Sequence, residues 1–157
     1  MICIDSVQLC ERAFLDDCDR LCMIGVMTRF PVPSLPIKMR QLMIVVRIAD
    51  IESEKSIGIG VAMVTPSGVS LSPNYSDGFD VRVTTEYILI TLHDIPFAEE
   101  GMHRFAVSVG QADPVSISVP VRLATNHAPP SRDANQKASH ALGQSSWVTG
   151  RDRKSVV

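Results

Sequence analysis

The chain has 157 residues, of which 45% are hydrophobic and 20% charged, and this composition excludes a chain that is disordered throughout. The formal net charge of −2 is unevenly placed, because residues 1–124 hold 10 Lys/Arg and 15 Asp/Glu whereas residues 125–157 hold 5 and 2. The acidic excess of the first part argues against a nucleic-acid-binding surface.

Strands are predicted where apolar residues alternate with polar ones or form short runs between turn signals. The first two candidates are residues 2–9 and 21–27, joined by a polar loop over residues 10–20. Three prolines keep residues 30–36 extended. Residues 41–49 form a near-continuous apolar run of strand length.

Large and small residues alternate over residues 56–64, which predicts a strand with its large side chains facing the core. A turn leads into a short strand at residues 69–71. Residues 83–92 are rich in β-branched side chains and predict a central strand. A corner follows over residues 94–101, with Ile95 and Phe97 available to close the end of the core.

The last two strands are predicted as a hairpin over residues 102–109 and 115–123. His103 and the apolar residues at 105, 107 and 109 share one face of the first strand. Pro120 lacks an N–H group, so the final strand is expected at a sheet edge or with a bulge.

These elements predict an all-β fold: a single antiparallel β-sandwich, immunoglobulin-like or jelly-roll-like, of seven or eight strands. The domain is expected to occupy residues 1–124. Residues 125–157 have no apolar periodicity, and we expect a flexible, disordered polar tail there.

The four cysteines, Cys3, Cys10, Cys18 and Cys22, lack the Cys-x-x-Cys spacing of structural zinc sites, so no metal is expected on them. Cys3 and Cys22 lie in apolar strand patterns, whereas Cys10 and Cys18 flank the polar loop and are expected to be exposed and oxidisable. A thiol enzyme or redox sensor would need a histidine beside one of these thiols, and His93 and His103 are the candidates in the domain.

Acidic residues collect in the predicted loops, and clustered carboxylates at the end of a sandwich can bind Ca²⁺. The loop positions are Asp16, Asp17, Asp19, Asp50, Glu52, Glu54, Asp77, Asp80, Asp94, Glu99 and Glu100. The stretch 74–80 has the composition of such a loop but equally of a plain turn.

No nucleotide-binding or hydrolase motif is present, and Gly58 and Gly60 lie inside a predicted strand. No apolar run approaches the length of a membrane span, and Asp5 and Glu11 occupy the region where a secretory signal would be basic and then apolar. We expect a cytoplasmic protein without a membrane span or a cofactor.

Several short stretches resemble an uncharacterised family of small bacterial proteins. They are residues 4–7 with Glu11, residues 21–26, residues 95–105 and residues 119–121. The resemblance covers residues 1–124 and implies a compact β-sandwich of unknown function, without an activity or a site.

With no catalytic motif, the favoured hypothesis is a non-enzymatic binding or scaffold module that acts through loops or a sheet edge. The Pro120 strand is the candidate edge, and the partner is an unknown protein or small ligand. The alternatives are a Ca²⁺-dependent sugar- or lipid-binding sandwich and a thiol-based enzyme or redox sensor that uses Cys10 or Cys18.

Overall fold

Ten strands in two five-stranded sheets make up the described part of the chain, residues 2–49, 57–73 and 79–125 of a computed structural model. Sheet A contains, in spatial order, β2 (Leu21–Val26), β1 (Cys3–Leu15), β4 (Ile37–Ala49), β8 (Tyr87–Phe97) and β7 (Phe79–Val83). Sheet B contains β3 (Phe30–Val32), β10 (Val115–Leu123), β9 (Gly101–Val109), β5 (Ile59–Val64) and β6 (Ser70–Leu71).

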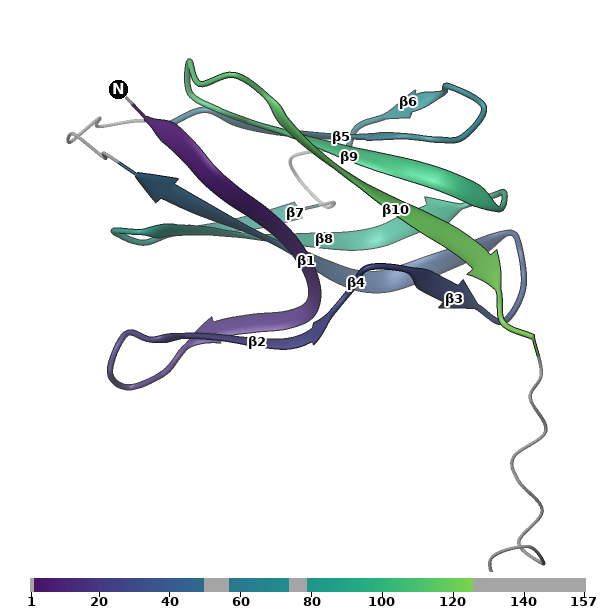
Figure 1. The fold of residues 1–157 in the computed structure, drawn as a ribbon, viewed down its shortest axis with the longest axis horizontal. Helices are drawn as coiled ribbons and strands as arrows, with labels where there is room; N and C mark the ends of the chain where they lie inside the picture. Colours follow the sequence, from purple (N-terminus) through teal and green to yellow (C-terminus); the bar gives the residue numbers. More distant parts are fainter. Residues whose placement is uncertain (1, 50–56, 74–78, 126–157) are drawn as a thin grey trace, which may run out of the picture. The chain divides into compact units, whose positions relative to one another are not determined.

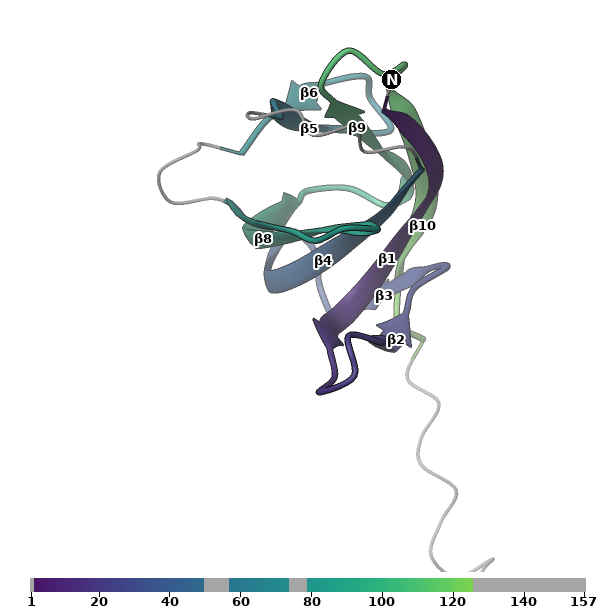
Figure 2. The ribbon, with the colours of Figure 1, turned by 90° about the vertical axis from the view of Figure 1, so that its left-hand side faces the viewer.

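The two sheets lie face to face as a sandwich (Figures 1 and 2). Neighbouring strands are antiparallel except for β3 and β10, which are parallel. The order β1-β4-β8-β7 opposite β10-β9-β5 is the order of an immunoglobulin-type sandwich, with A, B, E and D in one sheet and G, F and C in the other. Of the two predicted sandwich types, the structure therefore has the immunoglobulin-like one.

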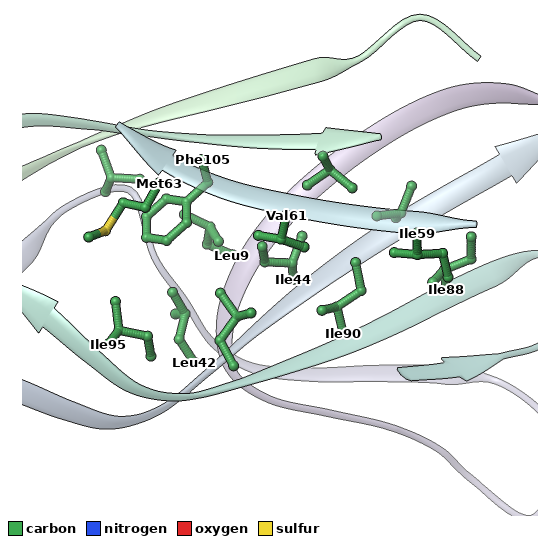
Figure 3. Close-up of a cluster of buried hydrophobic side chains, with 14 of the residues drawn as sticks. Leu9, Leu42, Ile44, Ile59, Val61, Met63, Ile88, Ile90, Ile95 and Phe105 are labelled. Atoms are coloured by element: carbon green, nitrogen blue, oxygen red, sulfur yellow. The ribbon is translucent and has the colours of Figure 1, made fainter. Parts of the chain in front are cut away.

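The core lies between the inner faces of the sheets and is built mainly from branched aliphatic side chains. In Figure 3, Ile44, Ile88 and Ile90 of sheet A point toward Val61 and Phe105 of sheet B. The predicted inward positions of β5 and β9 are confirmed, because the residues at alternate positions are buried. The period of two thus identified the core-facing side of both strands.

β4 is apolar on both faces over a longer stretch than its neighbour β8, where residues 88–90 are buried in the same way. Residues 42–46 are all buried, so successive side chains on opposite faces of sheet A are both removed from water. Leu42, Ile44 and Val46 belong to the core between the sheets, whereas Met43 and Val45 belong to a second apolar cluster on the outer face. Sheet A therefore needs a second cover outside the sandwich.

Two strand predictions are wrong. β1 continues through Leu15, so the predicted loop over residues 10–20 shrinks to a turn over residues 16–20. β7 is a separate edge strand that begins in the stretch predicted to be a turn, and residues 84–86 separate it from β8. Ten strands are found where seven or eight were expected because β7 and the short β3, within the stretch predicted only to be extended, are both strands.

The closing hairpin is confirmed, with β9 and β10 paired from Val115–Val107 to Val121–Gly101. The placement of β10 at a sheet edge is wrong. β10 lies between β9 and β3, and Pro120 immediately precedes the residues that pair with β3. The edges of the two sheets are β2, β7, β3 and β6.

Met1–Ala124 form one compact unit. The predicted tail, residues 125–157, lies almost wholly outside the described residues. No helix that could cross a bilayer occurs in the stretches that the structure describes.

His103 is the polar exception in the described core. It is fully buried, with its ring edge-on to Phe97 at a centroid distance of 5.1 Å. Nδ1 donates to the Gly101 carbonyl oxygen at 3.2 Å, whereas Nε2 has no hydrogen-bond partner among the described residues. A buried polar atom without a partner costs about 1–3 kcal/mol of stability.

We therefore expect His103→Leu to raise the free energy of unfolding by about 1 kcal/mol, because it removes the unpartnered nitrogen. Urea unfolding measures the change. Val107→Ala, on the same face of β9, is the control and should lower the free energy of unfolding by about 2 kcal/mol through lost packing. A His103→Leu protein less stable than the wild type would contradict the assignment.

Candidate functional site

The second half of β1 and the whole of β2 form a hairpin that we call the arm, residues 11–26. Its register runs from Leu15–Leu21 to Arg12–Ile24 and resumes at Cys10–Val26, without a Glu11–Gly25 pair. Gly25 has a φ of +65°, and a Cβ there would lie 2.8 Å from Cγ and Cδ of Glu11. The left-handed backbone favours glycine at this position, where the β1–β2 ladder is interrupted.

Asp16 holds the tip of the arm together. Its backbone N–H donates to the Arg20 carbonyl at 2.9 Å, and its carboxylate accepts the N–H groups of Cys18 and Arg20, both at 2.9 Å, and Nε of Arg20 at 2.7 Å. Asp19 has a φ of 57°, which completes a turn of the type expected for a three-residue hairpin loop. These donors, led by the backbone N–H of Arg20, lower the pKa of Asp16.

The arm covers the outer apolar patch of sheet A. The cluster beneath it consists of Cys10, Ala13, Met43, Val45 and Leu89, with Leu21, Met23 and Tyr87 partly buried at its margin. The N–H of Ala13 lies 3.1 Å from the sulfur of Met43, to which it donates. The arm is thus the second cover that the two-faced β4 requires.

The opposite face of the arm is exposed and carries apolar side chains together with Arg12, which pairs with Ile24. Phe14 pairs with Cys22, and Ile24 lies two residues further along the same face of β2. Phe14 is 44% exposed, Ile24 50% and Val26 53%. Grouped exposed apolar residues on one element are typical of interaction surfaces.

The four sheet edges differ in how they are protected against pairing with another chain. β6 has two residues, β3 has three and contains Pro31, and β7 carries Asp80 and Arg82. β2 has six residues with no charge and no proline. Short length, proline and charge are the usual protections of an edge strand, and β2 has none of them.

The outer edge of β2 also presents backbone hydrogen-bonding groups. In an antiparallel ladder, hydrogen-bonded and non-hydrogen-bonded pairs alternate, and the Asp16–Arg20 pair is hydrogen-bonded. By this alternation, Cys22 and Ile24 bond to β1, whereas the N–H and C=O groups of Leu21 and Met23 point away from it. Figure 2 shows β2 beside β1, at the end of sheet A that is remote from β8.

Three of the described acidic loop residues, Asp16, Glu99 and Glu100, accept hydrogen bonds that hold turns in place. Glu99 accepts the backbone N–H of Ser67 at 3.1 Å and its hydroxyl at 2.6 Å, and these bonds lower the pKa of Glu99. Glu100 accepts the N–H of Leu123 at 2.6 Å. Within the described stretches, no three His, Cys, Asp or Glu side chains are grouped so as to hold a metal ion. Residues 50–56 and 74–78 of the predicted acidic loops lie outside the described residues.

The cysteine predictions are partly wrong. Cys10 is fully buried under the arm rather than exposed, and burial raises the pKa of its thiol. Cys3 is exposed and Cys22 half-buried, although both were expected in apolar surroundings. The exposure of Cys18 is confirmed. A buried thiol with a raised pKa is a poor nucleophile.

The two candidate histidines have partners other than a thiol. Nε2 of His93 lies 3.0 Å from the Asp80 carboxylate and links β8 to β7. His103 lies in the core beside Phe97. The structure therefore does not bring either histidine to Cys10, which is packed among the apolar side chains under the arm.

A largely apolar cavity of about 370 Å³ lies between the sheets, lined by Val61, Met63, Leu71, Ser72, Pro73, Leu92, His93, Asp94, Ile95, Pro96 and Phe105. Its walls are core residues of β5, β8 and β9, several of which appear in Figure 3. The cavity supports no ligand assignment, because Ser72 and Pro73 at its rim lead directly into residues outside the described part.

Comparison with known proteins gives a family and a distant structural likeness. A family model described as "Family of unknown function (DUF6941)" matches residues 5–122. No curated protein matches the sequence. Among solved structures, "M1 domain from titin" is 13% identical with a TM-score of 0.30, covering 58% of this chain and 84% of that one. "Structure of Titin M4 trigonal form" is 12% identical with a TM-score of 0.30, covering 74% and 96%.

Gly25→Ala should release the arm, because the added Cβ meets Glu11 and the left-handed backbone disfavours any side chain. We expect alkylation of Cys10 by a thiol reagent, followed by peptide mass mapping, to become at least about tenfold faster, which corresponds to about 1.4 kcal/mol. Gly58→Ala is the control, since a Cβ there meets nothing within 4 Å. An unchanged rate in Gly25→Ala would show that the packing of the arm does not depend on Gly25.

Acid should loosen the tip of the arm. Because the pKa of Asp16 is lower in the folded chain than in the unfolded one, its contribution is present above the ordinary carboxyl pKa and is lost as the pH falls through the lowered value. NMR shifts of the Cys18 and Arg20 amides should report this change below about pH 4. Asp16→Asn should abolish the transition, and its persistence in that variant would refute the role of Asp16.

Proposed function

This chain belongs to the DUF6941 family, a family of unknown function, and we propose that it is a non-enzymatic protein-binding module whose β2 edge accepts an extended segment of another polypeptide as an added strand. Strand addition uses backbone hydrogen bonds for affinity and the side chains of the edge strand for selectivity. Both requirements are met by β2.

The single observation that carries the proposal is the contrast between β2 and the other edges. Short length protects β6, short length and a proline protect β3, and charged side chains protect β7. β2 is six residues long and uncharged, contains exposed Ile24 and Val26, and lies beside exposed Phe14 of β1. An unprotected apolar edge is an aggregation hazard unless a partner covers it. Its presence beside three protected edges therefore supports a binding role.

The chemistry expected of the partner follows from the arm. The N–H and C=O groups of Leu21 and Met23 need an extended backbone opposite them, and the exposed apolar face needs apolar side chains at alternate positions. A charged side chain of the partner opposite Ile24 would be desolvated against an apolar side chain, and a basic one would also be repelled by Arg12, which pairs with Ile24. The partner segment is therefore extended, uncharged over about four residues and rich in β-branched or aromatic side chains.

The alternative functions receive less support. The described acidic residues that would bind Ca²⁺ accept hydrogen bonds from backbone and hydroxyl groups, as at Asp16, Glu99 and Glu100. A thiol enzyme that uses Cys10 would need this side chain accessible, but it is fully buried. Cys18 is exposed, but both candidate histidines of the domain have other partners: His93 lies beside Asp80, and His103 lies beside Phe97 in the core.

Selection of displayed peptides on the full chain tests the proposal. We expect enriched peptides to be uncharged and extended, and to lose at least about tenfold in affinity, or 1.4 kcal/mol, when Ile24→Lys places a charge on the exposed face of β2. Methylation of alternate backbone nitrogens in a selected peptide should also weaken binding, because it removes strand hydrogen bonds.

Val81→Lys is the matched control. Val81, like Ile24, is an exposed β-branched residue on an edge strand, with 39% of its surface exposed on β7. It should change peptide affinity by less than about twofold. Peptides that bind the Ile24→Lys and wild-type chains equally would place the binding surface elsewhere, and the proposal for β2 would fail.

A further inference from the structure

The two ends of the β2 edge carry different charged side chains. The turn before β2 presents exposed Asp17 and Asp19 beside the Asp16–Arg20 ion pair, so it has an excess of acidic charge. After the strand ends, the Glu11 side chain lies against Gly25, and Arg29 is exposed three residues further on, just before β3 of sheet B. No ion pair within the described residues engages Asp17, Asp19 or Arg29.

We propose that the segment added to β2 is β2 of a second copy of this chain, paired antiparallel across a two-fold axis. This inference rests on the proposed function and names its partner. Antiparallel self-pairing brings the acidic turn of each copy beside Arg29 of the other, so opposite charges meet at both ends. Parallel self-pairing would place acidic turn against acidic turn and is disfavoured by repulsion.

The chemistry of the middle of the strand agrees with self-pairing. β2 supplies the uncharged segment that its own edge requires, and the two-fold axis brings the same donors and acceptors of both copies together. The exposed faces of the two arms would then join, with Phe14 and Ile24 of each copy on the same face of the joined sheet as Arg12. Two five-stranded sheets would become one ten-stranded sheet, which buries the unprotected edge in both copies.

The closing experiment is sedimentation equilibrium of the full chain over a range of concentrations. The wild type should dimerise, Ile24→Lys should raise the dimer dissociation constant at least about tenfold, and Val81→Lys should leave it within about twofold. Both substitutions lie on exposed positions of edge strands, so the comparison separates the β2 edge from a general effect of added charge.

A charge exchange tests the antiparallel geometry. Arg29→Glu makes both ends of the edge acidic, and Asp17→Lys combined with Asp19→Asn makes the turn basic, with Asn chosen because it tolerates the positive φ at residue 19. Each variant alone should dimerise more weakly than the wild type. An equimolar mixture of the two should form a heterodimer, since opposite charges then meet at both ends.

Three outcomes would overturn the inference. They are a wild type that stays monomeric up to about 100 μM, a dimer that Ile24→Lys does not weaken, and variants whose mixture associates no better than either alone. A monomeric wild type that still binds selected peptides in an Ile24-dependent way would overturn self-pairing and leave the proposed function intact. A wild type that neither dimerises nor binds selected peptides in an Ile24-dependent way would refute both self-pairing and the proposed function.

Discussion

One constraint organises this domain: a central strand that is apolar on both faces must be covered on both. Residues 42–46 of β4 are buried without interruption, and sheet B covers only the inner half of them. The outer half, with Leu89, is covered by Cys10, Ala13 and the partly buried side chains of the arm. β1 pairs with β4 over residues 3–10 and then continues as one strand of the arm, which pairs with β2 and supplies this cover. As a result of this arrangement, β2 is left as an exposed edge strand of sheet A.

Much of the fold could be predicted from the sequence because period-two patterns are local. The alternation in β5, β9 and β10 located these strands and most of their buried positions, and the near-continuous apolar run over residues 41–49 located β4. What covers β4 could not be predicted, since the adjacent charges of Glu11 and Arg12 interrupt the apolar pattern of β1 and made residues 10–20 resemble a polar loop. The same omission made Cys10 appear exposed. Strand order, and with it the identity of the edges, depends on contacts between residues far apart in sequence.

The candidate site was harder to predict than the fold, because it consists of a strand edge without a neighbouring strand and of exposed side chains on the arm. Pro120 indicated an edge from its missing N–H, yet β3 pairs with the residues that follow it. β2 reads as an ordinary apolar strand until its position at the end of sheet A is known. Only then does the absence of charge and proline in Leu21–Val26 become informative. The acidic loops present the reverse case, because Asp16, Glu99 and Glu100 suggested ligands for a metal ion and instead accept hydrogen bonds that hold turns and corners in place.

The tip of the arm has a further consequence for the order in which the chain folds. Every hydrogen bond that Asp16 makes at the turn is to a residue within four positions, so the hairpin needs no distant part of the chain to begin, and hairpins of this kind form in about 1–10 μs. The arm packs on β4 and β8, which pair with each other although they lie far apart in sequence. Pairing of distant strands is slower than formation of a local hairpin. We therefore expect the hairpin of the arm to form before the surface of β4 and β8 on which it packs. We expect contacts beneath the arm, such as Ala13 with Met43, to form late, so that their loss mainly accelerates unfolding and changes the folding rate little.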